Sequence, residues 1–185
     1  EFSLLGSSPF LSSLIFRPAA SHLAKNRFLT QITPQVRIDN FSQTLLTNAQ
    51  NRDATNFAPA LEESYFFNQR HFARLGYTYE QNWAEGADWD YHGHTIGGEL
   101  FLPLPFKFDL GLRASWLIDK HFDNDDSVLG ARRNDSGQTA GTTISYKLFK
   151  KLTLSGHYDF LRNASSLALF TYNRHIGGVT FATEF

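Results

Sequence analysis

The amino-acid sequence predicts an all-β fold built from long antiparallel strands that run up and down. Apolar and polar residues alternate over long stretches, and polar connections of alternating length separate these stretches. No apolar run approaches the roughly 18 residues that a membrane helix needs. The 18 Phe, 7 Tyr and 3 Trp among the 185 residues exclude a disordered chain. Cysteine is absent, which excludes disulfides and thiol chemistry.

The clearest alternation spans residues 106–119. Its even positions, from Phe106 to Ile118, are apolar, and most of its odd positions, from Lys107 to Asp119, are polar or small. Soluble strands usually have about 5–6 residues, whereas a tilted strand that crosses a membrane needs about 9–11. The length of this segment therefore favours a transmembrane strand.

Seven further segments show the same period of two and complete a set of eight strands: residues 28–38, 57–68, 71–81, 91–102, 138–148, 151–161 and 168–185. Short joints near residues 69–70, 103–105 and 149–150 alternate with long polar joints near residues 39–56, 82–90, 120–136 and 163–167. Short turns at one end and long loops at the other are typical of outer-membrane barrels. Residues 27–185 are therefore predicted to form an antiparallel, up-and-down transmembrane β-barrel.

Residues 1–26 do not fit the eight-strand pattern. Their apolar stretches, 2–5 and 10–16, are separated by Gly-Ser-Ser-Pro, and the segment lacks the basic start of a secretory signal. We interpret it as an additional hairpin, a plug, or the end of an upstream part. The expectation is a terminal piece of a barrel of about 14–16 strands, which would form a conduit. The alternative is a complete eight-stranded barrel that leaves no open channel.

Charged and polar residues on one side of the predicted strands would point into the barrel. They carry both signs of charge: Arg74, Glu80, Glu99, Lys107, Asp109, Arg113, Lys147, His157, Asp159 and Glu184. Side chains fill the interior of a closed eight-stranded barrel, so there these charges must pair. In a larger barrel they would line a water-filled pore.

Two clusters contain residue types used in catalysis or metal binding. Ser155, His157 and Asp159 are the types of a hydrolytic triad, but neighbours on one side of a strand lie about 6–7 Å apart. His92 and His94 share one side of a strand, which is compatible with Zn or Cu. A polar interior and a hydrated rim account for both clusters, so we expect no enzyme, no metal site and no cofactor. The net charge of −1 gives no sign of a nucleic-acid partner.

The last strand alternates through Val179 and Phe181 and ends on Phe185. A terminal Phe after such a strand resembles the signal that the bacterial barrel-assembly machinery reads. Thr180 stands where that signal usually has Gly. The resemblance implies assembly into the outer membrane.

The final hairpin carries a second resemblance. Its residues are Phe160, Arg162, Asn163, Ser165 or Ser166, Phe170, Tyr172 and Arg174. This run resembles the last hairpin of outer-membrane proteins that join periplasmic tetratricopeptide repeats to a C-terminal barrel, such as the surface lipoprotein assembly modifier family. The resemblance implies that the chain is the C-terminal part of such a protein.

The expected function is that of an integral protein of the bacterial outer membrane. It would act as a porin- or export-type conduit or as the barrel component of a membrane assembly. The expected partners are outer-membrane lipid (lipopolysaccharide and phospholipid), the barrel-assembly machinery and other subunits of an envelope complex. The alternatives are a small anchor or adhesin that acts through its loops, a lipid A-modifying enzyme, and a soluble ligand-binding β-barrel.

Overall fold

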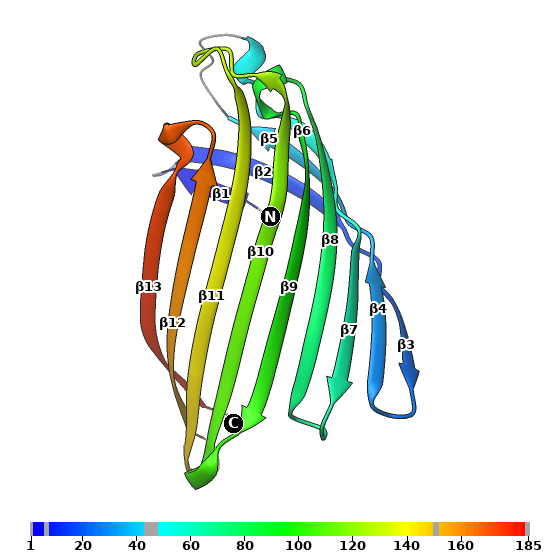
Figure 1. The fold of residues 1–185 in the computed structure, drawn as a ribbon, viewed down its shortest axis with the longest axis vertical. Helices are drawn as coiled ribbons and strands as arrows, with labels where there is room; N and C mark the ends of the chain where they lie inside the picture. Colours follow the sequence, from blue (N-terminus) through cyan, green and yellow to red (C-terminus); the bar gives the residue numbers. More distant parts are fainter. Residues whose placement is uncertain (1, 6–7, 43–47, 150–151, 184–185) are drawn as a thin grey trace.

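The computed structural model describes residues 2–5, 8–42, 48–149 and 152–183, and Figure 1 shows that it is all-β. One antiparallel sheet contains thirteen strands, which confirms the all-β, antiparallel part of the predicted fold. The strands are β1 (Phe2–Leu5), β2 (Ser8–Phe16), β3 (Ala20–Ala24), β4 (Phe28–Thr33), β5 (Val36–Phe41), β6 (Ala54–Phe57), β7 (Ala60–Phe66), β8 (Phe72–Ala84), β9 (Tyr91–Pro103), β10 (Phe108–Asp125), β11 (Arg132–Phe149), β12 (Leu152–Ser165) and β13 (Tyr172–Thr183). Four short 3-10 helices are η1 (Asn48–Gln50), η2 (Ala87–Trp89), η3 (Pro105–Lys107) and η4 (Ala168–Phe170). Within these residues, no helix is long and apolar enough to cross a membrane.

Three long passes of the chain are each divided into two strands near a proline. β2 gives way to β3 at Pro18, β4 to β5 at Pro34, and β6 to β7 at Pro59. Proline has no N–H to donate and interrupts the hydrogen-bond ladder. The two strands of each divided pass still pair with strands of the same neighbouring passes. β5 pairs with β2 and β6, and β4 pairs with β3 and β7. The thirteen strands therefore make ten passes.

From Phe28 onward the chain makes the eight passes that the alternation predicts. The strand count of about eight is too low because prolines divide two of these passes and because β1, β2 and β3 join the same sheet. The long joint predicted at residues 120–136 is wrong for most of its length, since β10 continues to Asp125 and β11 starts at Arg132. A bulge between Leu117 and Asp119 shifts the register there. It hides the continuing strand by changing the phase of the alternation.

The connections at the upper end of Figure 1 are tied to one another. The backbone N–H of Gly86 donates to the carbonyl oxygen of Asn51 at 3.0 Å. The backbone N–H and the hydroxyl of Ser127 donate to the Asp88 carboxylate at 2.8 Å and 2.6 Å. Three connections that are distant in sequence therefore form one packed end.

The strand pairs of the described residues leave the sheet with two edges. β13 pairs only with β12, and β1 pairs only with β2. β3 likewise has a partner, β4, on one side alone. The described strands form one curved, continuous sheet (Figure 1), and no strand pair among them joins β1 to β13.

Replacing Gly86 by Ala tests the packing of the upper end. A Cβ at this position would collide with the backbone of Ala49 and Asn51. We expect Gly86→Ala to lower the free energy of unfolding by about 1–3 kcal/mol, measured by urea titration. Gly156→Ala is the matched control, because a Cβ there meets open space. Equal losses in the two variants would contradict the packing described.

Candidate functional site

The sheet buries polar side chains on one face and exposes large apolar side chains on the other. Apart from a few bulges, alternate residues of each strand lie on one face, here called the inner face, which carries Arg74, Glu99 and Arg113. Most of the buried side chains in the described chain are polar: Asp39, Asn56, Ser64, His71, Asn82, Asp109, Asp135 and Asn163, against the apolar or aromatic Ala54, Tyr91 and Phe122. Buried polar groups and exposed large apolar groups are the informative features of a folded protein.

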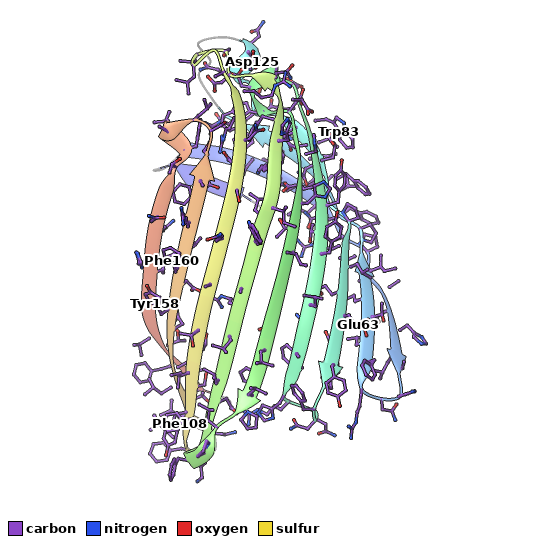
Figure 2. The ribbon with its side chains drawn as sticks, in the orientation of Figure 1. Glu63, Trp83, Phe108, Asp125, Tyr158 and Phe160 are labelled. Carbon is purple, nitrogen blue, oxygen red and sulfur yellow. The ribbon has the colours of Figure 1, made fainter. Side chains whose placement is uncertain are left out.

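The opposite, outer face exposes large apolar side chains. An outer apolar row runs across β4, β7, β8, β9 and β10 as consecutive register partners: Ile32, Leu61, Tyr77, Ile96 and Trp116. Each of the five is among the exposed large hydrophobic residues, with Trp116 at 51% exposure. Glu63, labelled in Figure 2, departs from this pattern and accepts a hydrogen bond from the Thr30 hydroxyl at 2.5 Å.

A row of charged side chains crosses the inner face three residues closer to the lower end than the outer apolar row, about 10 Å along the strands. Arg74 faces Glu99, Glu99 faces Arg113, Arg113 faces Gly141, and Gly141 faces Asp159. A guanidinium nitrogen of Arg74 lies 3.6 Å from a carboxylate oxygen of Glu99. The Arg113 guanidinium binds Asp159 through both of its carboxylate oxygens, with distances from 2.5 Å to 3.0 Å. We call these five residues the inner charge row.

Gly141 makes possible the Arg113–Asp159 ion pair, which reaches across an intervening strand. Arg113 and Asp159 lie on β10 and β12, and β11 runs between them. A Cβ at Gly141 would collide with the Asp159 carboxylate and with the Arg113 side chain. Because glycine stands at this position, the ion pair closes over the backbone of the strand that separates its two members.

A second polar cluster lies closer to the upper end and is centred on Glu80. One oxygen of its carboxylate accepts hydrogen bonds from the Asn56 amide at 2.8 Å and from the Tyr91 hydroxyl at 2.7 Å. The Lys120 ammonium lies 3.8 Å from the centroid of the Tyr91 ring. Asn56 is only 1% exposed. This cluster fills part of the inner face with satisfied polar groups.

Asp109 organises the lower end of the inner face. Its two carboxylate oxygens lie 2.5 Å from an Arg70 guanidinium nitrogen and 3.1 Å from Nε2 of His71. The Asn68 side-chain oxygen lies 3.0 Å from Nδ1 of His71 and orients the ring. The His71 ring also stacks on Phe101 at a centroid distance of 5.7 Å.

The remaining interior candidates are more scattered. Lys107 lies in η3, ahead of the strand, and Lys147 lies near the end of β11. His157 packs against Gly178, where a Cβ would collide with the imidazole. Glu184 lies outside the described residues.

Ser155, His157 and Asp159 are not joined into a triad in the part of the chain that the structure describes. The Ser155 hydroxyl lies 2.9 Å from the hydroxyl of Ser145, and the Asp159 carboxylate is held by Arg113. A triad needs hydrogen bonds from nucleophile to base and from base to carboxylate. The geometry therefore gives no support to the hydrolase alternative.

The histidine pair His92 and His94 lies on the outer face. Nδ1 of His94 is 2.7 Å from the Tyr77 hydroxyl, and Nδ1 of His92 is 3.2 Å from the Asp123 carboxylate. Across the described ranges, no group of three or more His, Asp or Glu side chains is arranged to hold a metal ion.

The residues of the expected assembly signal lie on the last strand. Val179 and Phe181 are register partners of Gly156 and Leu154, on the side of β12 opposite the inner charge row. Both are 68% exposed. Phe185 lies outside the described residues.

Sequence reasoning missed several residues of the inner face. Arg70 and His71 fall in or beside a joint, where alternation gives no signal of direction. Tyr91 is also absent from the predicted interior residues, yet it is buried beside Glu80. Its parity with Glu99 on β9 is the signal that could have placed it on the inner face.

No family model, no curated protein and no solved structure matches this chain. The resemblance of the final hairpin to surface lipoprotein assembly modifiers therefore stays a prediction, and geometry alone bears on function.

Substituting Gly141 tests the inner charge row. We expect Gly141→Ala to displace the Arg113–Asp159 ion pair and to lower the free energy of unfolding by about 1–3 kcal/mol in a urea titration. Gly177→Ala is the control, since the nearest atom to a Cβ there is at 3.8 Å. If both variants unfold at the same urea concentration, Gly141 is not needed for the pair.

The pair itself can be measured by a double-mutant cycle of Arg113→Gln and Asp159→Asn. The Arg113 side chain is about half exposed, so water screens the interaction. We expect a coupling energy of about 1 kcal/mol between the two sites. Strictly additive losses would show that the contact contributes nothing to stability.

Proposed function

We propose that this chain is an integral β-barrel protein of the bacterial outer membrane and a component of a passive conduit. The observation that carries the proposal is the reversed distribution of side chains, with exposed apolar residues on the outer face and polar residues buried on the inner face. Lipid-facing and lumen-facing residues alternate in this way along the strands of outer-membrane barrels.

The outer apolar row and the inner charge row support the proposal because both fit within the roughly 25 Å apolar band of an outer-membrane barrel. Their offset of three residues is about 10 Å along the strands. Tyr77 and Arg74 are three residues apart on β8, and Trp116 and Arg113 are three residues apart on β10. Contact of the outer apolar row with water costs free energy, whereas contact with the hydrocarbon of a membrane does not. The charges would lie inside the barrel at the depth of the hydrocarbon, shielded from lipid by the wall.

Space on the inner face favours a conduit over a filled anchor. A hollow of about 270 Å³ lies beside the inner charge row. Small residues border it, among them Gly76, Gly97 and Ser115, together with the carboxylate of Glu62. A filled barrel would place larger side chains there.

Closure of the barrel is part of the proposal. β1 and β13 belong to the first and the tenth pass, and neighbouring passes alternate in direction. Their free edges would therefore meet antiparallel, as a closed wall requires. A heat-dependent mobility shift of the folded chain on SDS gels tests this, and a chain that stays folded and soluble without detergent would overturn the membrane location.

Arginine substitutions on the two faces distinguish a membrane wall from a soluble sheet. Leu112 lies on the outer face and Ser115 on the inner face of the same strand. We expect Leu112→Arg to reduce the free energy of folding into detergent or lipid by about 2–4 kcal/mol. Ser115→Arg, beside Glu62 and Glu99, should cost clearly less. The reverse order would mean that the outer face meets water.

Conductance in planar bilayers tests the conduit. We expect discrete current steps from the inserted chain, with a reversal potential that depends on the inner charge row. Asp159→Asn leaves Arg113 unpaired and should shift selectivity toward anions, and Arg113→Gln should shift it toward cations. An inserted, heat-modifiable chain without conductance would exclude the conduit and favour an anchor.

A further inference from the structure

A second hollow, of about 480 Å³, opens at the lower end of the sheet, where η3 joins β9 to β10 and where β11 ends. Three basic side chains and three apolar ones form much of its lining: Arg70, Lys107, Lys147, Phe108, Leu148 and Phe149. Phe108, labelled in Figure 2, marks this end of the molecule. The hollow is separate from the inner charge row.

The charges in this hollow are not balanced. Asp109 is its carboxylate, and Arg70 and His71 already contact that group. Lys107 and Lys147 form no ion pair within the part of the chain that the structure describes. Three Lys and Arg side chains against one Asp leave an excess of two positive charges. An anion would be stabilised there.

The backbone of η3 is unusual at this place. Phe106 and Lys107 have φ angles of 62° and 67°, in the left-handed region that non-glycine residues seldom adopt. Hydrogen bonds hold the turn, with the Leu104 N–H donating to the Phe108 carbonyl oxygen at 2.8 Å. The result is that Lys107 lines the hollow while Phe106 is 86% exposed. Strained backbone of this kind clusters at ligand sites.

Apolar surface continues outward from the basic side chains. Phe149 is 71% exposed, and Leu148 and Phe108 are also among the exposed hydrophobic residues. A ligand that matches both parts has an anionic head and a hydrocarbon body. A free inorganic anion would use the lysines and leave the apolar wall empty.

We infer that this basic hollow binds the phosphate group of an anionic phospholipid. Lys107 and Lys147 would contact the phosphate, and an acyl chain would lie along Phe108 and Leu148. The choice of a lipid rests on the proposed membrane location.

Titration of fluorescently labelled phosphatidylglycerol into the folded chain in uncharged detergent micelles, followed by fluorescence anisotropy, tests the inference. Each surface lysine contributes roughly a fivefold factor to anionic lipid binding, so we expect Lys107→Gln with Lys147→Gln to weaken binding about 30-fold. Lys25→Gln is the control, because Lys25 is an exposed lysine in the turn between β3 and β4. It should leave the affinity unchanged.

Several outcomes would overturn the inference. Unchanged affinity in the double lysine variant would do so, as would competition by phosphatidylcholine equal to that by phosphatidylglycerol. Competition by inorganic phosphate as strong as that by the lipid would assign the hollow to a free anion. The heat-dependent gel shift of the same variants shows whether they still fold. A heat-modifiable chain with lysine-independent binding refutes this site alone, whereas a chain soluble without detergent refutes the membrane proposal.

Discussion

The unbroken register from β8 to β12 around Arg113 is the constraint on which the rest of the structure depends. Side chains in a strand alternate with a period of two, so a slip of one residue would move every charge to the outer face and every apolar group to the inner face. Arg74, Glu99, Arg113, Gly141 and Asp159 stay in one line across these five strands. The breaks in register lie outside this row, at the bulge after Leu117 in the middle of β10 and close to Lys147 near the end of β11.

The inner charge row also ties the strands together through side chains. Arg113 reaches across β11 to Asp159, and this contact requires a residue without a Cβ at position 141. The pair is partly open to water, so its direct contribution to stability is modest. Its greater consequence is for register, because a slipped β11 would place a side chain between the two partners.

The two ends of the sheet are built by different means. At the upper end, long connections dock on one another through hydrogen bonds such as those from Ser127 to Asp88. At the lower end, tight turns reverse the chain, and the turn before Phe108 does so with two consecutive left-handed residues. Among the described residues, this difference leaves Lys107 and Lys147 at the lower end without an ion pair.

Local pattern alone was enough to predict the antiparallel all-β fold, the eight passes from Phe28 onward and the face on which the inner charge row lies. These properties depend on residues one or two positions apart, and the alternation records them directly.

Tertiary structure alone decided which charges meet. Arg113 and Asp159 are 46 residues apart, and their contact depends on the register of three strands and on Gly141. The same holds for Arg70 and Asp109, which are 39 residues apart and which alternation could not pair. Prolines and a bulge disguised the remaining strands, because their pairing continues through neighbours in space after the local pattern has failed.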